Sequence, residues 1–284
     1  MIYFTDSEID QLITEDLPYF DLTSLSVRLG SKVARISFTT RHAAVICGTE
    51  EAVKIFEKFH IQPTLLSVSG EYIDEGIKFL EGEGLANNIH SIWRVTTNLM
   101  EFSSGIATRM RDLLNLAREV NPDISVVTTR KSLPFTKKLS LKAIQAGGGN
   151  VHRLGLSDTV LIFGNHIKFI GGIDNLILKL PEIAQRAAGR SITVEVKNAE
   201  DALKIAAAEL NGIQLDNLPA DTLKKLIPQI RKKNPALRIA AAGNINSTNI
   251  REYSDTGADI IVTSSPYYGK PADFQVNIEP VYDL

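Results

Sequence analysis

The residues that could do chemistry follow short apolar runs in the second half of the chain. The runs read as buried parallel strands, each followed by a helical pattern. If these strands close into a barrel, the residues after each strand meet the ligand, because the carboxyl ends share one face. At these positions stand two cations, two carboxylates and two small-residue loops: Thr129, Arg130, Lys131, Glu195, Asp216, Gly243, Asn244, Thr263 and Ser264. We expect an anion-binding site there.

Glu195 and Asp216 end neighbouring expected strands. Paired carboxylates suit a hard divalent ion such as Mg²⁺, which keeps several waters and bridges carboxylate to phosphate. Buried carboxylates tied into backbone N–H groups would give the same pattern, so both interpretations stay open. Gly243 would let backbone N–H groups approach an oxyanion, and Asn246-Ser247-Thr248 opens an expected helix. An ordinary tight turn with a helix cap also explains that loop.

Arg130 and Arg153 present planar donor forks that match carboxylates or phosphates in pairs. His152 precedes Arg153 in a loop that follows three consecutive glycines, Gly147-Gly148-Gly149. Three glycines cost more backbone entropy than a simple chain reversal requires. We therefore expect the backbone there to approach a ligand or a partner closely. A structural role for His152 stays open.

The elements that must position these residues fall into two parts. The first 92 residues mix strand-like pieces with a helix at 50–59, which is typical of a small α+β domain. A long helix follows to residue 117, and its small residues at 104–108 predict close packing against a neighbour. Six strands, with room for a seventh, are expected at 124–128, 160–163, 192–196, 212–215, 238–242 and 259–262. This repeated strand-helix unit closes into a barrel or winds an open sheet.

Composition excludes several classes of protein. The 284 residues include 31 basic and 33 acidic side chains, so no global field favours nucleic acid or an anionic membrane. No apolar run approaches the roughly 18 residues of a membrane span, and no secretion signal is recognisable, so we expect a cytoplasmic protein. Cys47 is the only cysteine, which excludes disulfides within the chain and favours a buried packing role.

Further motifs occur in order along nearly the whole chain. They are Glu15-Asp16, Asp21-Leu22-Thr23-Ser24, Ser104-Gly105-Ile106-Ala107-Thr108, Thr129-Arg130-Lys131-Ser132-Leu133-Pro134, His152-Arg153-Leu154-Gly155-Leu156-Ser157-Asp158, Asn165-His166-Ile167, Glu195-Val196, Leu215-Asp216-Asn217 and Gly257-Ala258-Asp259. In this order they resemble the quinolinate phosphoribosyltransferase family, the nicotinate-nucleotide pyrophosphorylases. The resemblance implies an N-terminal open α/β sandwich, residues 1–108 with 270–284 returning to it. It also implies a C-terminal seven-stranded open α/β barrel, residues 109–269.

The resemblance also implies roles for individual residues. Arg130, Arg153 and His152 would bind an acidic small molecule beside Thr129, with Arg94 reaching in from the partner subunit of a homodimer or larger assembly. Lys131, Glu195 and Asp216 would handle phosphoribosyl pyrophosphate and its Mg²⁺ as the catalytic group. The 5′-phosphate would be held by two small-residue loops, Ala242, Gly243 and Asn244 with Thr263 and Ser264.

Phe163 is the largest departure from the family pattern, because a lysine that meets a substrate carboxylate stands there in the family's enzymes. Leu17-Pro18-Tyr19, Phe102-Ser103-Ser104-Gly105 and Val262-Thr263-Ser264-Ser265-Pro266-Tyr267-Tyr268 depart together with it. These departures resemble the ModD branch of the family, whose members accompany molybdate transport and are called pyrophosphorylases by relationship. The implied function is transfer of a phosphoribosyl group to an acidic molecule other than quinolinate.

Two other functions remain open from the sequence. The chain could be an authentic decarboxylating quinolinate phosphoribosyltransferase of NAD biosynthesis that tolerates Phe163. It could also bind an anion or a molybdenum-related metabolite without turning it over. The metal-handling pair Glu195 and Asp216, with Lys131, favours an enzyme, because a pure binding protein has little need of them.

Overall fold

The computed structural model describes residues 2–282, and the chain falls into two compact units. The first comprises the residues up to Arg111, the segment Leu133–Gly148 and the residues from Tyr268 onward. The second comprises Asp112–Ser132 and Gly149–Tyr267. The domain boundaries expected from the sequence stay predictions, and residues 283 and 284 of the expected returning segment lie outside the described residues. Within residues 2–282, every helix is too short or too polar to cross a membrane.

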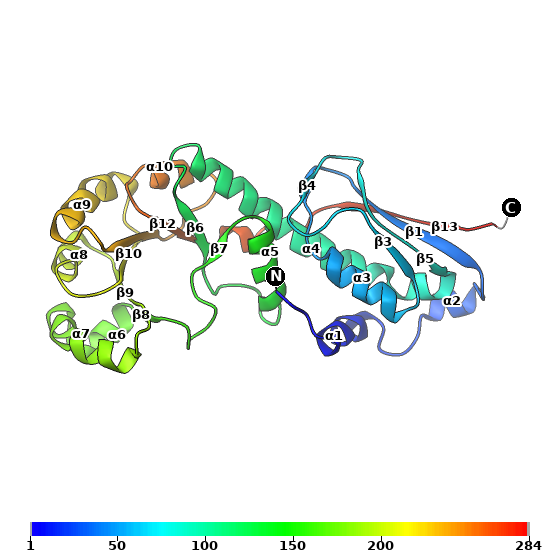
Figure 1. Ribbon diagram of the computed structural model, residues 1–284, viewed down its shortest axis with the longest axis horizontal. Helices are drawn as coiled ribbons and strands as arrows, with labels where there is room; N and C mark the ends of the chain where they lie inside the picture. Colours follow the sequence, from blue (N-terminus) through cyan, green and yellow to red (C-terminus); the bar gives the residue numbers. More distant parts are fainter. Residues whose placement is uncertain (1, 283–284) are drawn as a thin grey trace. The chain divides into compact units, whose positions relative to one another are not determined.

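The first unit is built on an antiparallel four-stranded sheet in the order β13-β1-β5-β3 (Figure 1). Its elements are α1 (Asp6–Asp16), α2 (Leu22–Ser26), β1 (Val33–Thr40), β2 (Ala44–Val45), α3 (Thr49–Lys58), β3 (Gln62–Leu65), β4 (Tyr72–Ile73), β5 (Lys78–Leu85), most of α4 (Ala86–Arg118), α5 (Lys137–Ala146) and β13 (Phe274–Pro280). The last strand, β13, pairs with β1 in antiparallel register and so belongs to the sheet of the first unit.

Alternating burial along β1 shows which face of this sheet forms the core. Ala34, Ile36 and Phe38 are buried, whereas Arg35, between Ala34 and Ile36, is exposed. The buried face packs against α3 and α4 through a large apolar cluster that includes Ile55, Phe56 and Ile89. Gly82 on β5 belongs to this face, because a Cβ there would lie 2.5 Å from the Phe56 ring. The absence of a side chain at Gly82 therefore allows Phe56 to pack against the sheet.

The small residues of α4 pack closely against neighbouring segments of the first unit, as expected. The Ser104 hydroxyl accepts a hydrogen bond from the backbone N–H of Cys47 at 2.9 Å, and a Cβ on Gly105 would lie 2.9 Å from the Ala272 nitrogen. Gly147 also packs too closely against α4 for a side chain, since a Cβ added there would lie 2.4 Å from the Ala107 carbonyl oxygen. Close approach to α4 thus accounts for this glycine of the triplet without a ligand.

The second unit contains a seven-stranded parallel sheet in the order β7-β6-β12-β11-β10-β9-β8. Its strands are β6 (Ser125–Thr128), β7 (Asn150–Val151), β8 (Val160–Ile162), β9 (Ile192–Val196), β10 (Gly212–Asp216), β11 (Arg238–Ala242) and β12 (Ile260–Thr263). Its other elements are α6 (Gly164–Ile170), α7 (Ile173–Ala187), α8 (Ala199–Ile205), α9 (Ala220–Lys233), α10 (Ile250–Ser254) and the short 3₁₀ helix Ser265–Tyr267. The mixed α/β class and the seven-stranded barrel-type sheet are confirmed.

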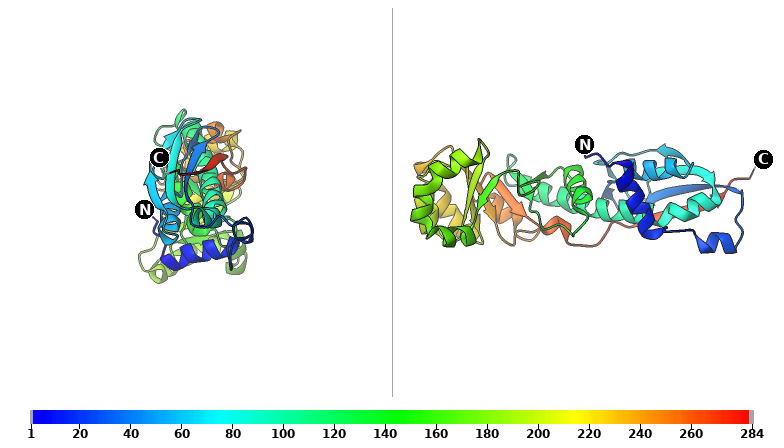
Figure 2. Two further views of the ribbon diagram at one scale, coloured as in Figure 1. Left: turned by 90° about the vertical axis from the view of Figure 1, so that its right-hand side faces the viewer. Right: turned by 90° about the horizontal axis from the view of Figure 1, so that it is seen from below.

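The two faces of this parallel sheet carry different side chains. Helices α7, α8 and α9 lie along one face, as Figure 1 and the view from below in Figure 2 both show. On the opposite face, Val127, Ala240, Ala242 and Val262 form a cluster of small apolar side chains. Side chains alternate along a strand, so residues two apart share a face. The polar groups on this inner face are concentrated on β9 and β10.

Candidate functional site

Glu195 and Asp216 stand on neighbouring strands of the second unit, near their carboxyl ends. Burial raises the pKa of the Glu195 carboxyl, and the nearby charge of Asp216 raises it further. Lys197 lies 3.4 Å from Asp216 and opposes the rise in the Glu195 pKa. One Asp216 oxygen also accepts a hydrogen bond from the Asn217 side-chain amide at 2.8 Å. The two carboxylates expected from the sequence therefore share one electrostatic environment.

Gln214 belongs to the same group and was missed from the sequence. It pairs in register with Glu195, and its amide nitrogen donates a hydrogen bond to Glu195 Oε2 at 2.7 Å. The apolar run from Gly212 to Leu215 predicts only a buried strand, which hides the glutamine. A polar residue in the middle of a buried strand is the signal that could have found it, because buried polar groups need partners.

Arg130, His152 and Arg153 form a second, cationic group. Burial lowers the pKa of Arg153, and the positive charge of Arg130 lowers it further, so the two guanidinium groups interact electrostatically. Burial also lowers the pKa of His152, with Arg153 adding to the effect, so the imidazole is neutral at pH 7. Arg153 is only 7% exposed, and its Nε has no hydrogen-bond partner among residues 2–282. Two clustered cations and a buried unpaired N–H suit an anionic ligand.

Lys131 and Thr129 are in the loop after β6. The Thr129 hydroxyl lies 2.6 Å from that of Ser264, which follows β12, and it accepts a hydrogen bond from the Lys131 backbone N–H at 3.2 Å. Strand β6 pairs with β12, so residues 135 positions apart in sequence meet at the ends of these strands. The positive charge of Lys131 acts on the Glu195 carboxyl and lowers its pKa, against the larger effects of burial and of Asp216.

Gly243 and Asn244 turn the chain after β11 with left-handed φ angles of 101° and 51°. A Cβ on Gly243 would lie 2.5 Å from the Asn217 backbone nitrogen, so only glycine fits. Buried Thr263 supports this turn by donating its hydroxyl hydrogen to the Ile245 carbonyl at 2.5 Å. The expected helix at Thr248 is wrong in its start. Asn246 Oδ1 instead accepts hydrogen bonds from the Thr248 N–H and hydroxyl, and α10 begins at Ile250.

Phe163 precedes α6 and is half-buried. Its ring meets that of His166 edge-on, with 4.2 Å between ring centroids, and its backbone N–H donates to His166 Nδ1 at 3.3 Å. By alternation from Leu161 it belongs to the inner face of the sheet. An apolar aromatic group therefore stands at this position of the second unit.

Arg94 belongs to α4 in the first unit. Its guanidinium stacks on the Trp93 ring at 4.1 Å from the centroid, and its side chain is exposed. Its expected contact with a substrate held by another subunit stays a prediction.

Glu195 and Asp216 are the carboxylates that could hold a metal ion in the second unit. Among residues 2–282, the side chains of His, Cys, Asp and Glu form no group of three or more that could hold a metal. Mg²⁺ is commonly held by one or two carboxylates together with substrate phosphates and water. Glu195 and Asp216 therefore fit a metal ion that arrives with a phosphorylated substrate.

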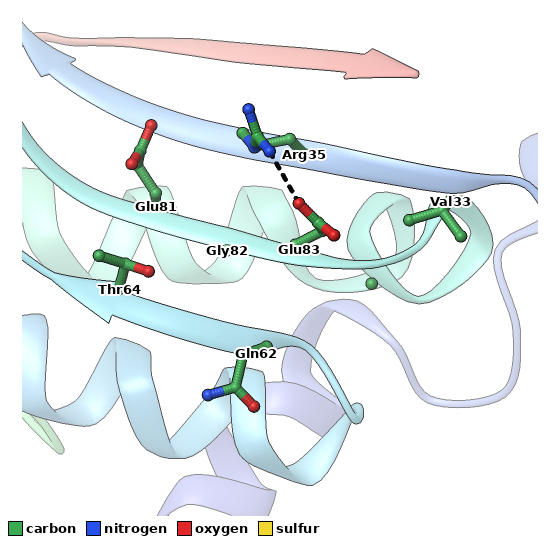
Figure 3. Close-up of a pocket in the computed structure, with 8 residues that line it drawn as sticks. Val33, Arg35, Gln62, Thr64, Glu81, Gly82 and Glu83 are labelled. Carbon is green, nitrogen blue, oxygen red and sulfur yellow. Dashed lines mark hydrogen bonds and ion pairs between the residues drawn. The ribbon is translucent and has the colours of Figure 1, made fainter. Parts of the chain in front are cut away.

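A shallow pocket of about 390 Å³ lies in the first unit, on the face of the four-stranded sheet opposite α3 and α4. Figure 3 shows Arg35 and Glu83 paired across its floor, 2.9 Å apart, with Glu81, Thr64 and Gln62 around them. None of the residues expected to act on a substrate lines it. The cationic and carboxylate groups of the second unit are therefore the better candidate for the site.

Known proteins with similar sequences and structures identify the class to which this fold belongs. The quinolinate phosphoribosyl transferase C-terminal domain matches residues 106–277, and the N-terminal domain of the same enzymes matches residues 21–104. The nicotinate-nucleotide pyrophosphorylase of Ehrlichia chaffeensis superposes with a TM-score of 0.89 at 25% identity, over 98% of this chain and 100% of that one. The fold is thus that of a phosphoribosyltransferase.

Two relatives are similar over almost their full lengths. "Putative pyrophosphorylase ModD" of Pasteurella multocida is 33% identical over 98% of this chain and 99% of its own. "Probable nicotinate-nucleotide pyrophosphorylase [carboxylating]" of Methanothermobacter thermautotrophicus is 29% identical over 95% of this chain and 97% of its own. The chain belongs to the quinolinate phosphoribosyl transferase family, and it is an enzyme of the pentosyltransferase type.

Proposed function

We propose that the protein transfers a phosphoribosyl group from phosphoribosyl pyrophosphate to an acidic small molecule other than quinolinate. One observation carries the proposal. The second unit holds a cationic group, Arg130 and Arg153, and a carboxylate group, Glu195 and Asp216, at or just after the carboxyl ends of strands in one parallel sheet. The charge of Lys131 acts on Glu195. A transferase that joins an acid to a phosphorylated, metal-carrying donor requires both kinds of group.

The cationic group binds the acceptor in this proposal. Arg153 is fixed by burial and donates to the Leu156 carbonyl at 3.3 Å, which leaves other N–H groups of its guanidinium for a carboxylate. Neutral His152 contributes a hydrogen-bond donor or acceptor beside it without adding charge. Because Arg130 and Arg153 repel each other, an anion between them relieves that repulsion as well as forming charge-assisted hydrogen bonds.

The carboxylate group and Lys131 act on the donor. Pyrophosphate leaves C1 of the ribose with the electrons of the broken C–O bond, and the acceptor supplies the electron pair of the new bond to C1. Glu195 and Asp216 would hold Mg²⁺ together with the donor, and such an ion would supply positive charge to the leaving pyrophosphate. Lys131 would place an ammonium group on the leaving oxygens. Glu195 and Asp216 would orient the ribose and hold the metal-bound donor, so that catalysis is chiefly positioning and electrostatics.

The small-residue loops would hold the 5′-phosphate of the donor. Gly243 and Asn244 form a left-handed turn after β11, and Thr263 and Ser264 end β12 next to Thr129. Ala242 leads into the turn and is buried, with no polar side chain to compete for the phosphate. Backbone N–H groups at such turns commonly bind anions.

Phe163 supports an acceptor different from quinolinate. Its apolar ring cannot pair with a carboxylate, and a carboxylate placed against it would lose hydration without compensation.

We also propose a homodimer in which Arg94 reaches the site of the other subunit, and a role for the product in molybdenum metabolism. The resemblance of the sequence motifs to the quinolinate phosphoribosyltransferase family is the basis of the first of these proposals, and their resemblance to its ModD branch is the basis of the second.

A single-turnover assay of pyrophosphate release tests the function. The protein is mixed with phosphoribosyl pyrophosphate, Mg²⁺ and each of a broad panel of acidic small molecules, quinolinate included. We expect release with at least one acid other than quinolinate, and loss of release in Lys131→Met and Asp216→Asn. The absence of release with every acid would refute transfer, and tight Mg²⁺-independent acid binding in the same samples would indicate a binding protein instead.

A further inference from the structure

Gln214 is a buried polar residue whose side chain is hydrogen-bonded to Glu195, a contact that core packing alone does not require. Its side chain is 6% exposed, and it lies beside Glu195 on the neighbouring strand. The amide nitrogen donates to Glu195 Oε2 at 2.7 Å. Its register neighbour on the other side is Ala240, whose methyl group belongs to the apolar cluster of the inner face. The glutamine amide is thus placed between a carboxylate and an apolar surface.

The other end of the Gln214 amide is unpaired. Gln214 Oε1 is buried and has no hydrogen-bond partner in the part of the chain that the structure describes. A carboxylate can only accept hydrogen bonds, so the amide must turn its NH₂ group to Glu195 and its oxygen away. Burying an unpaired acceptor opposes folding. Gln214 therefore lowers the stability of the fold through its unpaired oxygen while it donates a hydrogen bond to Glu195, which is typical of a functional site.

The two carboxylates are held in the same manner. Asp216 Oδ2 accepts from the Asn217 amide at 2.8 Å, as Glu195 Oε2 accepts from Gln214. Each carboxylate thus has one oxygen bound to an amide and a second oxygen for another ligand. Asn217 is exposed, so water can replace its hydrogen bond, whereas the buried Gln214 amide cannot be replaced in that way.

We propose that Gln214 is a positioning residue that fixes the Glu195 carboxylate, so that its second oxygen and that of Asp216 face the same metal-bound substrate. The inference rests on the proposed function, because it concerns the same carboxylates. Partners that orient a metal's ligands typically change its affinity roughly 10- to 100-fold when they are removed. Gln214 would therefore matter for binding of the metal-bound donor although it touches neither metal nor substrate.

The test uses Gln214→Met, which keeps the length and volume of the side chain but removes both polar atoms. Mn²⁺ binding is measured by electron paramagnetic resonance with phosphoribosyl pyrophosphate present, and the Glu195 conformation is read from a crystal structure of the variant. We expect affinity to fall roughly 10- to 100-fold and the Glu195 carboxylate to turn from its present position. The thermal midpoint should change by less than about 4 °C, since an unpaired buried oxygen is removed together with the hydrogen bond.

Gln214→Asn is the second variant, because it keeps the amide but is one methylene too short to reach Glu195, and it should show the same loss. Gln229→Met is the matched control, because that amide donates to the Lys225 carbonyl on the exposed face of α9. The Mn²⁺ affinity of this variant should not change. Unchanged affinity in Gln214→Met, or an unmoved Glu195, overturns the positioning role. If the unchanged protein does not bind Mn²⁺ with the donor but Glu195 still turns in the variant, the proposed function fails and the positioning role stands.

Discussion

The ammonium group of Lys142 on α5 lies 2.7 Å from a carboxylate oxygen of Glu50 on α3, and the neighbouring Glu51 pairs with the same ammonium. Lys142 is 5% exposed, so the ion pair is almost fully removed from water. Glu50 also accepts hydrogen bonds from the backbone N–H and the hydroxyl of Ser69. This buried network attaches α5 to α3 within the first unit.

Replacing Lys142 with methionine should destabilise the protein by roughly 3–5 kcal/mol, because two carboxylates then stay buried without their cation. Urea unfolding at pH 7 measures the change. Lys224→Met is the control, since its pair with Asp255 is exposed and is worth about 0–1 kcal/mol. Equal effects of the two substitutions would show that burial does not strengthen the Lys142 network.

Glu50 should make the first unit sensitive to acid. Burial raises its pKa, but hydrogen bonds from Lys142 and Ser69 outweigh this and lower the pKa from 4.5 to about 2. A carboxyl group with a depressed folded pKa stabilises fully above its unfolded pKa and loses that contribution as pH falls through the folded value. Stability should therefore drop between pH 4.5 and 2. The thermal midpoints of the unchanged protein and of Glu50→Gln should converge as the pH falls over that range. Midpoints that stay equally far apart at every pH would contradict the lowered pKa of Glu50.

Gly243→Ala should destabilise the second unit. The new Cβ would meet the Asn217 backbone nitrogen at 2.5 Å, in addition to the strain of a φ of 101°. Strained backbone of this kind costs roughly 1–3 kcal/mol. Gly257→Ala is a matched control, because its φ is 83° but the nearest atom, Ile227 Cγ2, lies 3.5 Å away. Thermal unfolding measures the loss of stability in both variants. The amount by which the loss in Gly243→Ala exceeds that in Gly257→Ala gives the contribution of the steric clash.

Phe163→Lys should increase turnover of quinolinate by roughly 10- to 100-fold in kcat/KM, since one charge-assisted hydrogen bond contributes about 1.5–3 kcal/mol. The apolar substitution Phe163→Met should produce no gain. Steady-state release of pyrophosphate with quinolinate measures both. If the unchanged protein already converts quinolinate at an ordinary enzymatic rate, Phe163 does not exclude that acid.

The sequence predicted the parallel strands that are long and apolar, and it missed one that is neither. Asn150–Val151 forms only two ladder pairs, with Val127 and Thr128, and no apolar run marks it. Gln214 was missed for the opposite reason, because an apolar run conceals it. Strand ends could be read from the pattern of residues, so Glu195 and Asp216 were found as candidates. The contact of Thr129 with Ser264 depends on strand order, which local patterns do not contain.

The segment Leu133–Gly148 groups with the first unit, although the second unit precedes and follows it in the chain. No single cut of the polypeptide can therefore separate the two units. A fragment that began at residue 109 would carry α5 without α3, and Lys142 would be left as a buried cation with no carboxylates to neutralise it. A truncation that is meant to isolate either unit must therefore remove or rejoin internal segments of the chain.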